Sequence, residues 1–321
     1  MSDASAQDRV AVVLIGRNEG ARLVAALQSV SGKARRIVYV DSGSTDGSVA
    51  AAEAAGARVV KLDMTRPFTA ARARNEGFAA LGADLPEFVQ FMDGDCALDP
   101  GWIETAVRFV DAHPQVAVVC GRRRERFPEA SIYNAICDAE WDTPVGRTKA
   151  CGGDALVRTA AFAAAGGFDP HLVAGEEPEL CVRIRAAGWE VWRLDAEMTL
   201  HDAAMTRFGQ WWKRSRRAGH AFAEGAAMHG APPERHFVAE TRRALIWGAA
   251  LPLAAICGML VTPWSLLLLA GWPLQVLRLA PRLGFGHAVF MVTGKAAEAS
   301  GVLEYHLRRL AGRPSGLIEY K

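Results

Sequence analysis

Short apolar segments alternate with helical patterns along the first hundred residues, and this alternation constrains the fold more than any other feature of the sequence. The apolar segments are rich in Val and Ile, as buried strands are, and the segments between them have helical patterns. Strands and helices that alternate at this spacing predict an α/β fold with a parallel sheet and right-handed crossovers. We expect strands at residues 10–15, 36–40, 58–62 and 87–92, and helices at 21–30, 50–55 and 70–81.

Later segments extend this pattern and limit the kind of phosphate site. No Gly-x-Gly-x-x-Gly follows the first strand and no Gly-x-x-x-x-Gly-Lys-Ser/Thr occurs, so dinucleotide and Walker-type sites are disfavoured. Arg122-Arg123-Arg124 is a short basic run, which is more typical of a solvated edge than of a binding patch. We expect further strands at 116–120, 155–158 and 191–194, and further helices at 102–112 and 179–187.

Two carboxylates, Asp93 and Asp95, stand one residue apart where the strand at 87–92 ends. Ligands of open α/β sheets bind in the crevice outside the carboxyl ends of the strands. Carboxylate oxygens are hard ligands that suit Mg or Mn carrying a diphosphate. Asp-Gly-Asp is also ordinary turn chemistry, so a simple turn is the alternative interpretation.

The composition excludes some classes of function. The formal net charge of +2 argues against a dedicated nucleic-acid binder, so we expect no nucleic-acid partner. The six cysteines show neither a Cys-x-x-Cys nor a zinc spacing, which predicts reduced and mostly buried thiols. Residues 1–9 are polar and have no signal-peptide core, so we expect the N-terminal part to stay in the cytoplasm.

Residues 244–277 contain no Asp, Glu, Lys, Arg or His. A bilayer core is about 30 Å thick and about 20 helical residues cross it, so the run is too long for one span. It is better interpreted as a hydrophobic hairpin of two segments, 245–261 and 264–277, broken at Thr262-Pro263. A hairpin that spans the membrane and one that only dips into it both fit, and a buried helical pair in a soluble core is the alternative.

Positive charge flanks this run on both sides, which predicts that both of its ends lie on the cytoplasmic side of the membrane. The charges are Arg242 and Arg243 before the run and Arg278 and Arg282 after it. We therefore expect the protein at the cytoplasmic side of the inner (plasma) membrane, held there by the C-terminal hairpin.

Several polar motifs follow one another along residues 10–225, and together they resemble the inverting family 2 glycosyltransferases with a GT-A fold. The resemblance implies a nucleotide-diphospho-sugar transferase with a mostly parallel sheet flanked by helices. We expect this catalytic domain at residues 1–240, and the hydrophobic hairpin with a membrane-associated tail at 241–321. The motifs are Arg17-Asn18-Glu19, Asp41-Ser42-Gly43-Ser44-Thr45-Asp46, Ala73-Arg74-Asn75-Glu76-Gly77, Asp93-Gly94-Asp95, Gly166-Gly167-Phe168-Asp169 and Gly175-Glu176-Glu177-Pro178-Glu179-Leu180.

The resemblance implies a divalent metal, Mn or Mg, that stabilises the departing diphosphate of a nucleotide sugar. Asp95 corresponds to the direct metal ligand, and Asp93 to the residue that contacts the ribose or the metal. His201 corresponds to the family's later metal-binding histidine. Without the resemblance, a lone histidine is more simply an ordinary surface or core residue. Gly152-Gly153-Asp154 is expected near the acceptor by the same analogy.

The resemblance also implies a nucleotide pocket. Asp41 corresponds to the carboxylate that reads the base and the ribose, to which its acceptor oxygens are suited. Glu19 is expected to help form this pocket, and Arg74 corresponds to the basic residue near the base and phosphates. The alternatives are turn capping for Asp41 and Asp46, and a solvated helix face for Arg74.

Inversion of the sugar requires a general base that removes the acceptor's hydroxyl proton. The family usually has Glu-Asp for this purpose at the start of a helix, and this chain has Glu176-Glu177. We expect Glu177 to be the base, with Glu176 as its near competitor. Adjacent carboxylates repel, so one pKa is expected to rise. The alternative is two acids that merely favour a helix N-terminus.

These interpretations predict a metal-dependent enzyme that moves one sugar from a nucleotide sugar to a hydroxyl acceptor. The acceptor is expected to be lipid-linked or a glycan, as in bacterial surface-polysaccharide or glycolipid assembly. The chain lacks the Gln-x-x-Arg-Trp of processive synthases, which favours single-sugar transfer. One rival is a sugar nucleotidyltransferase, which should carry a Gly-rich loop after the first strand. The other is a catalytically inactive membrane scaffold that binds nucleotide sugars.

Overall fold

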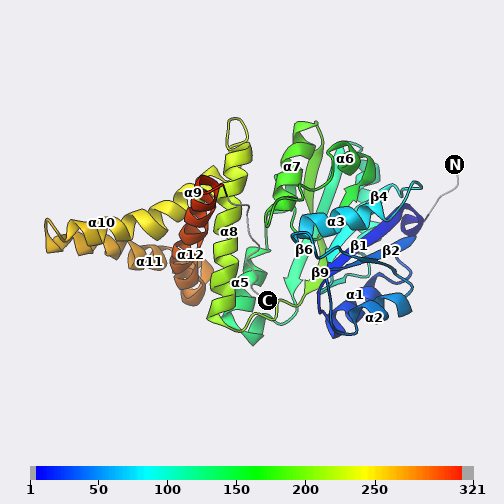
Figure 1. Ribbon diagram of the computed structural model, residues 1–321, viewed down its shortest axis with the longest axis horizontal. Helices are drawn as coiled ribbons and strands as arrows, with labels where there is room; N and C mark the ends of the chain where they lie inside the picture. Colours follow the sequence, from blue (N-terminus) through cyan, green and yellow to red (C-terminus); the bar gives the residue numbers. More distant parts are fainter. Residues whose placement is uncertain (1–4, 313–321) are drawn as a thin grey trace. The chain divides into compact units, whose positions relative to one another are not determined.

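The computed structural model of the protein describes residues 5–312 and is shown in Figure 1. Contacts within the chain separate two compact units. The first unit comprises the residues up to 128 together with 137–172 and 176–204. The second comprises 129–136, 173–175 and the residues from 205 onward. The helix α5 (Ile132–Glu140) contributes residues to both.

The first unit is built on a nine-stranded sheet in the order β3-β2-β1-β4-β8-β6-β9-β5, with β7 also paired to β9. The strands β1 to β4 are parallel where they pair, but β8 runs antiparallel to both β4 and β6, and β5 and β7 run antiparallel to β9. The prediction of a mostly parallel sheet is therefore corrected to a mixed sheet. The strands are β1 (Val10–Gly16), β2 (Arg36–Asp41), β3 (Arg58–Lys61), β4 (Phe88–Asp93), β5 (Cys96–Leu98), β6 (Val116–Glu125), β7 (Gly146–Thr148), β8 (Ala155–Arg158) and β9 (Glu190–His201).

Helices connect these strands and cover the sheet (Figure 1). The central strand β1 is buried from Val10 to Ile15, as expected for a parallel strand whose two faces are both covered. This core extends into β2, β4, β6 and β8. The helices of this unit are α1 (Ala21–Val30), α2 (Ser48–Ala54), α3 (Ala70–Ala79), α4 (Trp102–Ala112), α6 (Thr159–Ala164) and α7 (Glu176–Ala186), with a short 3-10 turn at Ala6–Arg9. A further 3-10 turn comprises Pro128–Ala130.

Strand register brings the polar motifs to one edge of the sheet. Gly16, at the end of β1, pairs with Asp41 at the end of β2. Ile15 pairs with Asp93 at the end of β4. Two of the carboxylates named from the sequence therefore lie at the carboxyl ends of strands that flank β1 on either side. This is the edge at which α/β sheets bind their ligands.

The second unit is helical, and its apolar run folds into short pieces. Ile246–Ala250 is a π-helical turn, α10 (Leu251–Gly258) ends before the bend at Thr262, and Pro263–Ala270 is a 3-10 helix. The bend lies where Thr262-Pro263 predicted it. The Ser265 hydroxyl donates to the Ala255 carbonyl at 2.8 Å, which closes a helical hairpin. The other helices that lie wholly in this unit are α8 (Phe208–His229), α9 (Val238–Leu245), α11 (Gly271–Leu283) and α12 (Phe285–Leu310).

None of the helices in residues 5–312 has both the length and the apolar character that a membrane crossing requires. The expected membrane hairpin, and with it the expected localisation at the membrane through that hairpin, is therefore wrong. The two expected segments, 245–261 and 264–277, are divided in the structure among the π-helical turn, α10, the 3-10 helix and α11. Residues 313–321 of the expected tail lie outside the described residues.

Gly77 on α3 is a packing position that the fold requires. A Cβ atom there would lie 2.4 Å from Val13 Cγ1 and 2.9 Å from Val40 Cγ2, so α3 can approach β1 and β2 only if this residue has no side chain.

We expect Gly77→Ala to lower the free energy of unfolding by about 1–3 kcal/mol, because the added methyl group overpacks the core. Gly209→Ala is the matched control, since a Cβ atom there meets nothing within 4 Å. Urea denaturation followed by circular dichroism measures both. Equal stability of the two variants would contradict the packing described here.

Candidate active site

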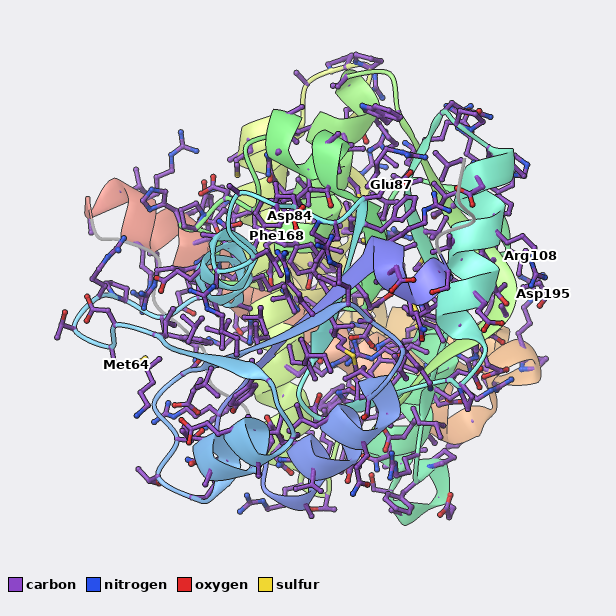
Figure 2. The ribbon with its side chains drawn as sticks, turned by 90° about the vertical axis from the view of Figure 1, so that its right-hand side faces the viewer. Met64, Asp84, Glu87, Arg108, Phe168 and Asp195 are labelled. Atoms are coloured by element: carbon purple, nitrogen blue, oxygen red, sulfur yellow. The ribbon has the colours of Figure 1, made fainter. Side chains whose placement is uncertain are left out.

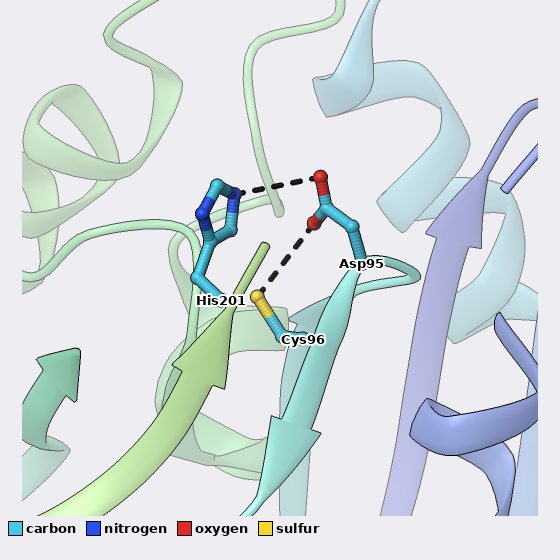
Figure 3. A group of neighbouring side chains, drawn as sticks. All are labelled: Asp95, Cys96 and His201. Atoms are coloured by element: carbon cyan, nitrogen blue, oxygen red, sulfur yellow. Dashed lines mark hydrogen bonds and ion pairs between the residues drawn. The ribbon is translucent and has the colours of Figure 1, made fainter. Parts of the chain in front are cut away.

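The site is built around the turn between β4 and β5. The Gly94 N–H donates to the Ile15 carbonyl at 2.8 Å, which holds this turn against the end of β1. The strand β5 then runs antiparallel to β9, with Cys96 opposite His201. His201 therefore lies beside Asp95, with His201 Nε2 3.4 Å from Asp95 Oδ2 (Figure 3). Residues more than a hundred positions apart in sequence meet here through one strand pairing.

Asp95 and His201 form a group that can hold a divalent cation. Potential ligand atoms of Asp95, Cys96 and His201 all lie within 4.8 Å of one another, and all three residues are buried (Figure 3). Burial raises the pKa of the Cys96 thiol well above its ordinary value, so this sulfur is a neutral neighbour. The carboxylate of Asp95 is a ligand that suits Mn or Mg, and the imidazole of His201 is a common metal ligand.

A second acidic group adjoins the first. Atoms of Asp93, Cys96 and Asp154 also lie within 4.8 Å of one another, so Cys96 belongs to both groups. Asp154 accepts hydrogen bonds from the Asp93 N–H at 3.1 Å and from the Thr199 hydroxyl at 2.7 Å. Asp93, Asp95 and His201 are therefore brought together. Asp154 was expected from the sequence only as part of an acceptor loop.

Arg123 carries a positive charge into this group. Its guanidinium lies 3.4 Å from Asp93 Oδ2 and 3.4 Å from Asp154 Oδ2, and it stacks over the Trp141 ring at 4.8 Å. Its side chain is only 14% exposed, whereas that of Arg124 is 47% exposed. The interpretation of the basic run as a solvated edge is therefore wrong for Arg123. The basic run directly continues the apolar part of strand β6. This continuity was the signal in the sequence from which the burial of Arg123 could have been predicted.

Arg74 connects these acids to the start of α7. Its guanidinium lies 2.8 Å from Asp93, 2.8 Å from Glu176 and 2.9 Å from Glu177. It also lies over the ring of Phe168, which Figure 2 labels, at 5.6 Å. Burial opposes its charge, but the carboxylates of Glu177, Asp93 and Glu176 raise the pKa of Arg74 above its ordinary value. Arg74 is 2% exposed, so it does not lie on a solvated helix face.

The two adjacent acids of α7 differ in their surroundings. The side chain of Glu176 is 5% exposed and that of Glu177 is 15% exposed. Burial and, next, the Glu176 carboxylate raise the pKa of Glu177 to about 7, against the opposing effect of Arg74. A carboxylate with a pKa near 7 is suited to accept a proton at neutral pH.

The backbone at Gly153 passes directly against these charges. A Cβ atom there would lie 3.0 Å from Asp93 Oδ2 and 3.1 Å from an Arg74 guanidinium nitrogen. Gly153 therefore leaves the space that the Asp93–Arg74 pair occupies, and a larger residue would displace these side chains.

Asp41 and Glu19 lie at the ends of the neighbouring strands. Asp41 is buried and accepts hydrogen bonds from the N–H groups of Gly43 and Ser44 and from the Tyr39 hydroxyl. Glu19 pairs with Arg22 at 2.7 Å. Its Cγ lies 3.5 Å from the position of a Cβ atom on Gly94, so Glu19 adjoins the β4–β5 turn. Sequence reasoning did not single out Tyr39, whose hydroxyl supports Asp41.

Asp46 has a local structural contact. It accepts a hydrogen bond from the Ser48 N–H at 2.9 Å, in the first turn of α2. This is the turn capping that a Ser-Thr-Asp-Gly loop favours.

Solved structures of glycosyltransferases have the same fold as this chain. A mannosyltransferase from Pyrobaculum calidifontis, solved with GDP-Man and Mn2+, superposes with a TM-score of 0.67 at 22% identity, over 92% of this chain and 87% of that one. Glucosyl-3-phosphoglycerate synthase from Mycobacterium tuberculosis, solved with Mn2+, UDP and glucosyl-3-phosphoglycerate, gives a TM-score of 0.50 at 19% identity. That match covers 71% of this chain and 82% of the synthase. The fold is therefore that of the GT-A glycosyltransferases.

Residues 11–163 match the family model described as glycosyl transferase family 2. This part of the chain is therefore similar to the family 2 glycosyltransferases. A curated relative, the pre-mycofactocin glycosyltransferase of Mycobacterium tuberculosis, is 29% identical over 234 residues, which cover 68% of this chain. The same match covers 48% of the relative, so the chain spans about half the length of that protein.

We expect Arg74→Ala to lower the free energy of unfolding at pH 7 by about 3–5 kcal/mol, because it leaves buried carboxylates without their cation. Arg124→Ala is the matched control: its partner Glu197 is 50% exposed, and such pairs contribute about 0–1 kcal/mol. Urea denaturation measures the difference. Equal losses would show that Arg74 does not hold the cluster together.

Proposed function

We propose that this protein transfers one sugar from a nucleoside diphosphate sugar to a hydroxyl acceptor, with inversion at the anomeric carbon. The observation that carries the proposal is the convergence of Asp93, Asp95, His201 and Glu177 from separate segments into one connected group. A metal-ligand pair and a carboxylate with a raised pKa are the two chemical requirements of this reaction. The similarity to enzymes solved with GDP-Man or UDP supports a nucleotide sugar as the donor.

Asp95 and His201 are the residues that we propose to hold Mn or Mg, with Asp93 beside them. When bound, the cation supplies positive charge that stabilises the departing diphosphate. Asp41, whose position is fixed by Tyr39 and by its own loop, is proposed to contact the base and ribose, with Glu19 next to it. Arg74 is enclosed by carboxylates, so we propose that it fixes Asp93 and Glu177 in place.

Glu177 is the proposed general base. Its side chain is the more exposed of the two adjacent acids, and its pKa of about 7 matches proton transfer at neutral pH. Glu176 shares Arg74 and contributes the negative charge that raises the pKa of Glu177. Arg74 holds both carboxylates through the same guanidinium nitrogen, which restricts how the Glu177 side chain can turn.

The acceptor that we propose carries a hydroxyl that is either lipid-linked or part of a glycan. The two share the reacting group and differ in what carries it. Transfer assays with a soluble glycan and with a lipid-linked glycan distinguish them. Only the true acceptor class should give a transfer rate that saturates as the acceptor concentration increases.

We expect removal of divalent metal with EDTA to abolish transfer from the preferred nucleotide sugar, and added Mn2+ to restore it. Asp95→Asn should lower the transfer activity that a given Mn2+ concentration restores, because one anionic ligand is lost. Asp195→Asn, an exposed aspartate labelled in Figure 2, is the control and should behave as the unmodified chain. Full activity in EDTA would contradict metal dependence, and donor binding without any release of nucleoside diphosphate would indicate a scaffold.

We expect kcat/KM to increase about tenfold per pH unit below pH 7 and to level off above it, since the base acts only when deprotonated. Glu177→Gln should lower kcat/KM by about 10²–10⁴-fold and remove this dependence. A Glu176→Gln variant provides the comparison. If Glu176→Gln were the more damaging change and Glu177→Gln kept the pH profile, the base would be Glu176.

A further inference from the structure

Glu125 lies buried against His201, on the side of the ring away from Asp95. It is the last residue of β6, and its side chain is completely buried. Glu125 Oε2 lies 3.3 Å from His201 Nδ1, while His201 Nε2 is 3.4 Å from Asp95. The ring is thus held between two carboxylates, one at each nitrogen. The ring also makes a T-shaped contact with the Trp141 ring, at 4.8 Å between centroids.

This geometry bears on which nitrogen of His201 is available to a cation. A neutral imidazole has one N–H and one nitrogen with a free lone pair. If Nδ1 carries the proton and donates a hydrogen bond to Glu125, the lone pair of Nε2 faces Asp95. Carboxylates that accept the second N–H of a metal-binding histidine fix its tautomer and orientation and increase its basicity.

Backbone groups hold Glu125 in this position. The Ala203 N–H donates to both carboxylate oxygens, at 3.1 and 3.3 Å, and the Phe127 N–H donates to Oε1 at 3.3 Å. A buried carboxylate is costly unless such donors stabilise its charge. The carboxylate of Glu125 is therefore held by backbone N–H groups of residues 127 and 203. Its position does not depend on another flexible side chain.

We propose that Glu125 is a positioning residue for the metal centre, which holds His201 with Nε2 directed at the cation. This inference rests on the proposed function, because it takes Asp95 and His201 as the metal ligands. It adds a residue that no motif in the sequence indicated. A purely structural Glu125 would instead connect the end of β6 to residue 203 and would leave metal affinity unchanged.

The test measures Mn2+ binding to the full chain without donor or acceptor, by the EPR signal of free Mn2+. We expect Glu125→Gln to weaken Mn2+ binding by about 10–100-fold, because the charge behind His201 is lost. Glu197→Gln is the matched control, since Glu197 is an exposed glutamate of β9 paired with Arg124, and it should bind Mn2+ as the unmodified chain does. Thermal unfolding of each apo variant separates loss of affinity from loss of fold.

The variants His201→Ala and Asp95→Asn distinguish the proposed role of Glu125 from the proposed metal site itself. If both weaken Mn2+ binding and Glu125→Gln does not, the role of Glu125 is overturned while the proposed metal site stands. If neither weakens it, the proposed metal site fails, and the role of Glu125 fails with it.

Nitrogen NMR of the unmodified chain labelled with ¹⁵N-histidine provides a second measurement that does not require any Glu125 variant to fold. We expect His201, assigned by the signal lost in His201→Ala, to carry its proton on Nδ1. A dominant Nε2–H tautomer would overturn the proposal.

Discussion

The structure of the site depends on one buried cation, the guanidinium of Arg74. It contacts Asp93 from the end of β4 and Glu176 and Glu177 from the start of α7, each within 3 Å. These carboxylates would repel one another if they were buried without a positive charge between them. The planar guanidinium offers several donors in fixed directions, so one side chain can hold groups from two elements. Phe168 covers it, and Gly153 leaves room for its pair with Asp93.

Carboxylates nevertheless outnumber cations around Arg74, and this excess of negative charge has chemical consequences. Arg123 stabilises Asp93 and Asp154 as Arg74 stabilises the acids of α7. Asp95 lies beside the imidazole of His201, and a buried carboxylate is suited to attract a divalent cation. The same excess of negative charge, with burial, raises the pKa of Glu177 to about 7. The proposed cation binding and the proposed proton acceptance therefore share one electrostatic origin at this edge of the sheet.

The sequence predicted local features well and their assembly only partly. The helices at 21–30 and 102–112 and the strand at 155–158 have the expected bounds, since their periodicity and flanking residues are local signals. The strand at 191–194 extends to His201, and the one at 116–120 extends to Glu125, because pairing between β6 and β9 continues past their apolar parts. That pairing encloses Arg123, which was expected at a solvated edge, and buries Glu125, which no pattern in the sequence singled out. The apolar run was misinterpreted because composition alone does not show that its helices are short.

What the sequence by itself determined was the chemistry available: a carboxylate pair at a strand end, two adjacent acids before a helix, and an arginine on another helix. It determined the alternation of strands and helices too, because apolar periodicity is a property of neighbouring residues. Only the tertiary structure decided which of these groups meet. The antiparallel pairing of β5 with β9 places His201 at Asp95, and the end of β6 places Glu125 behind it. Distances between residues far apart in the chain are set by strand register and packing, and no local pattern in the sequence encodes them.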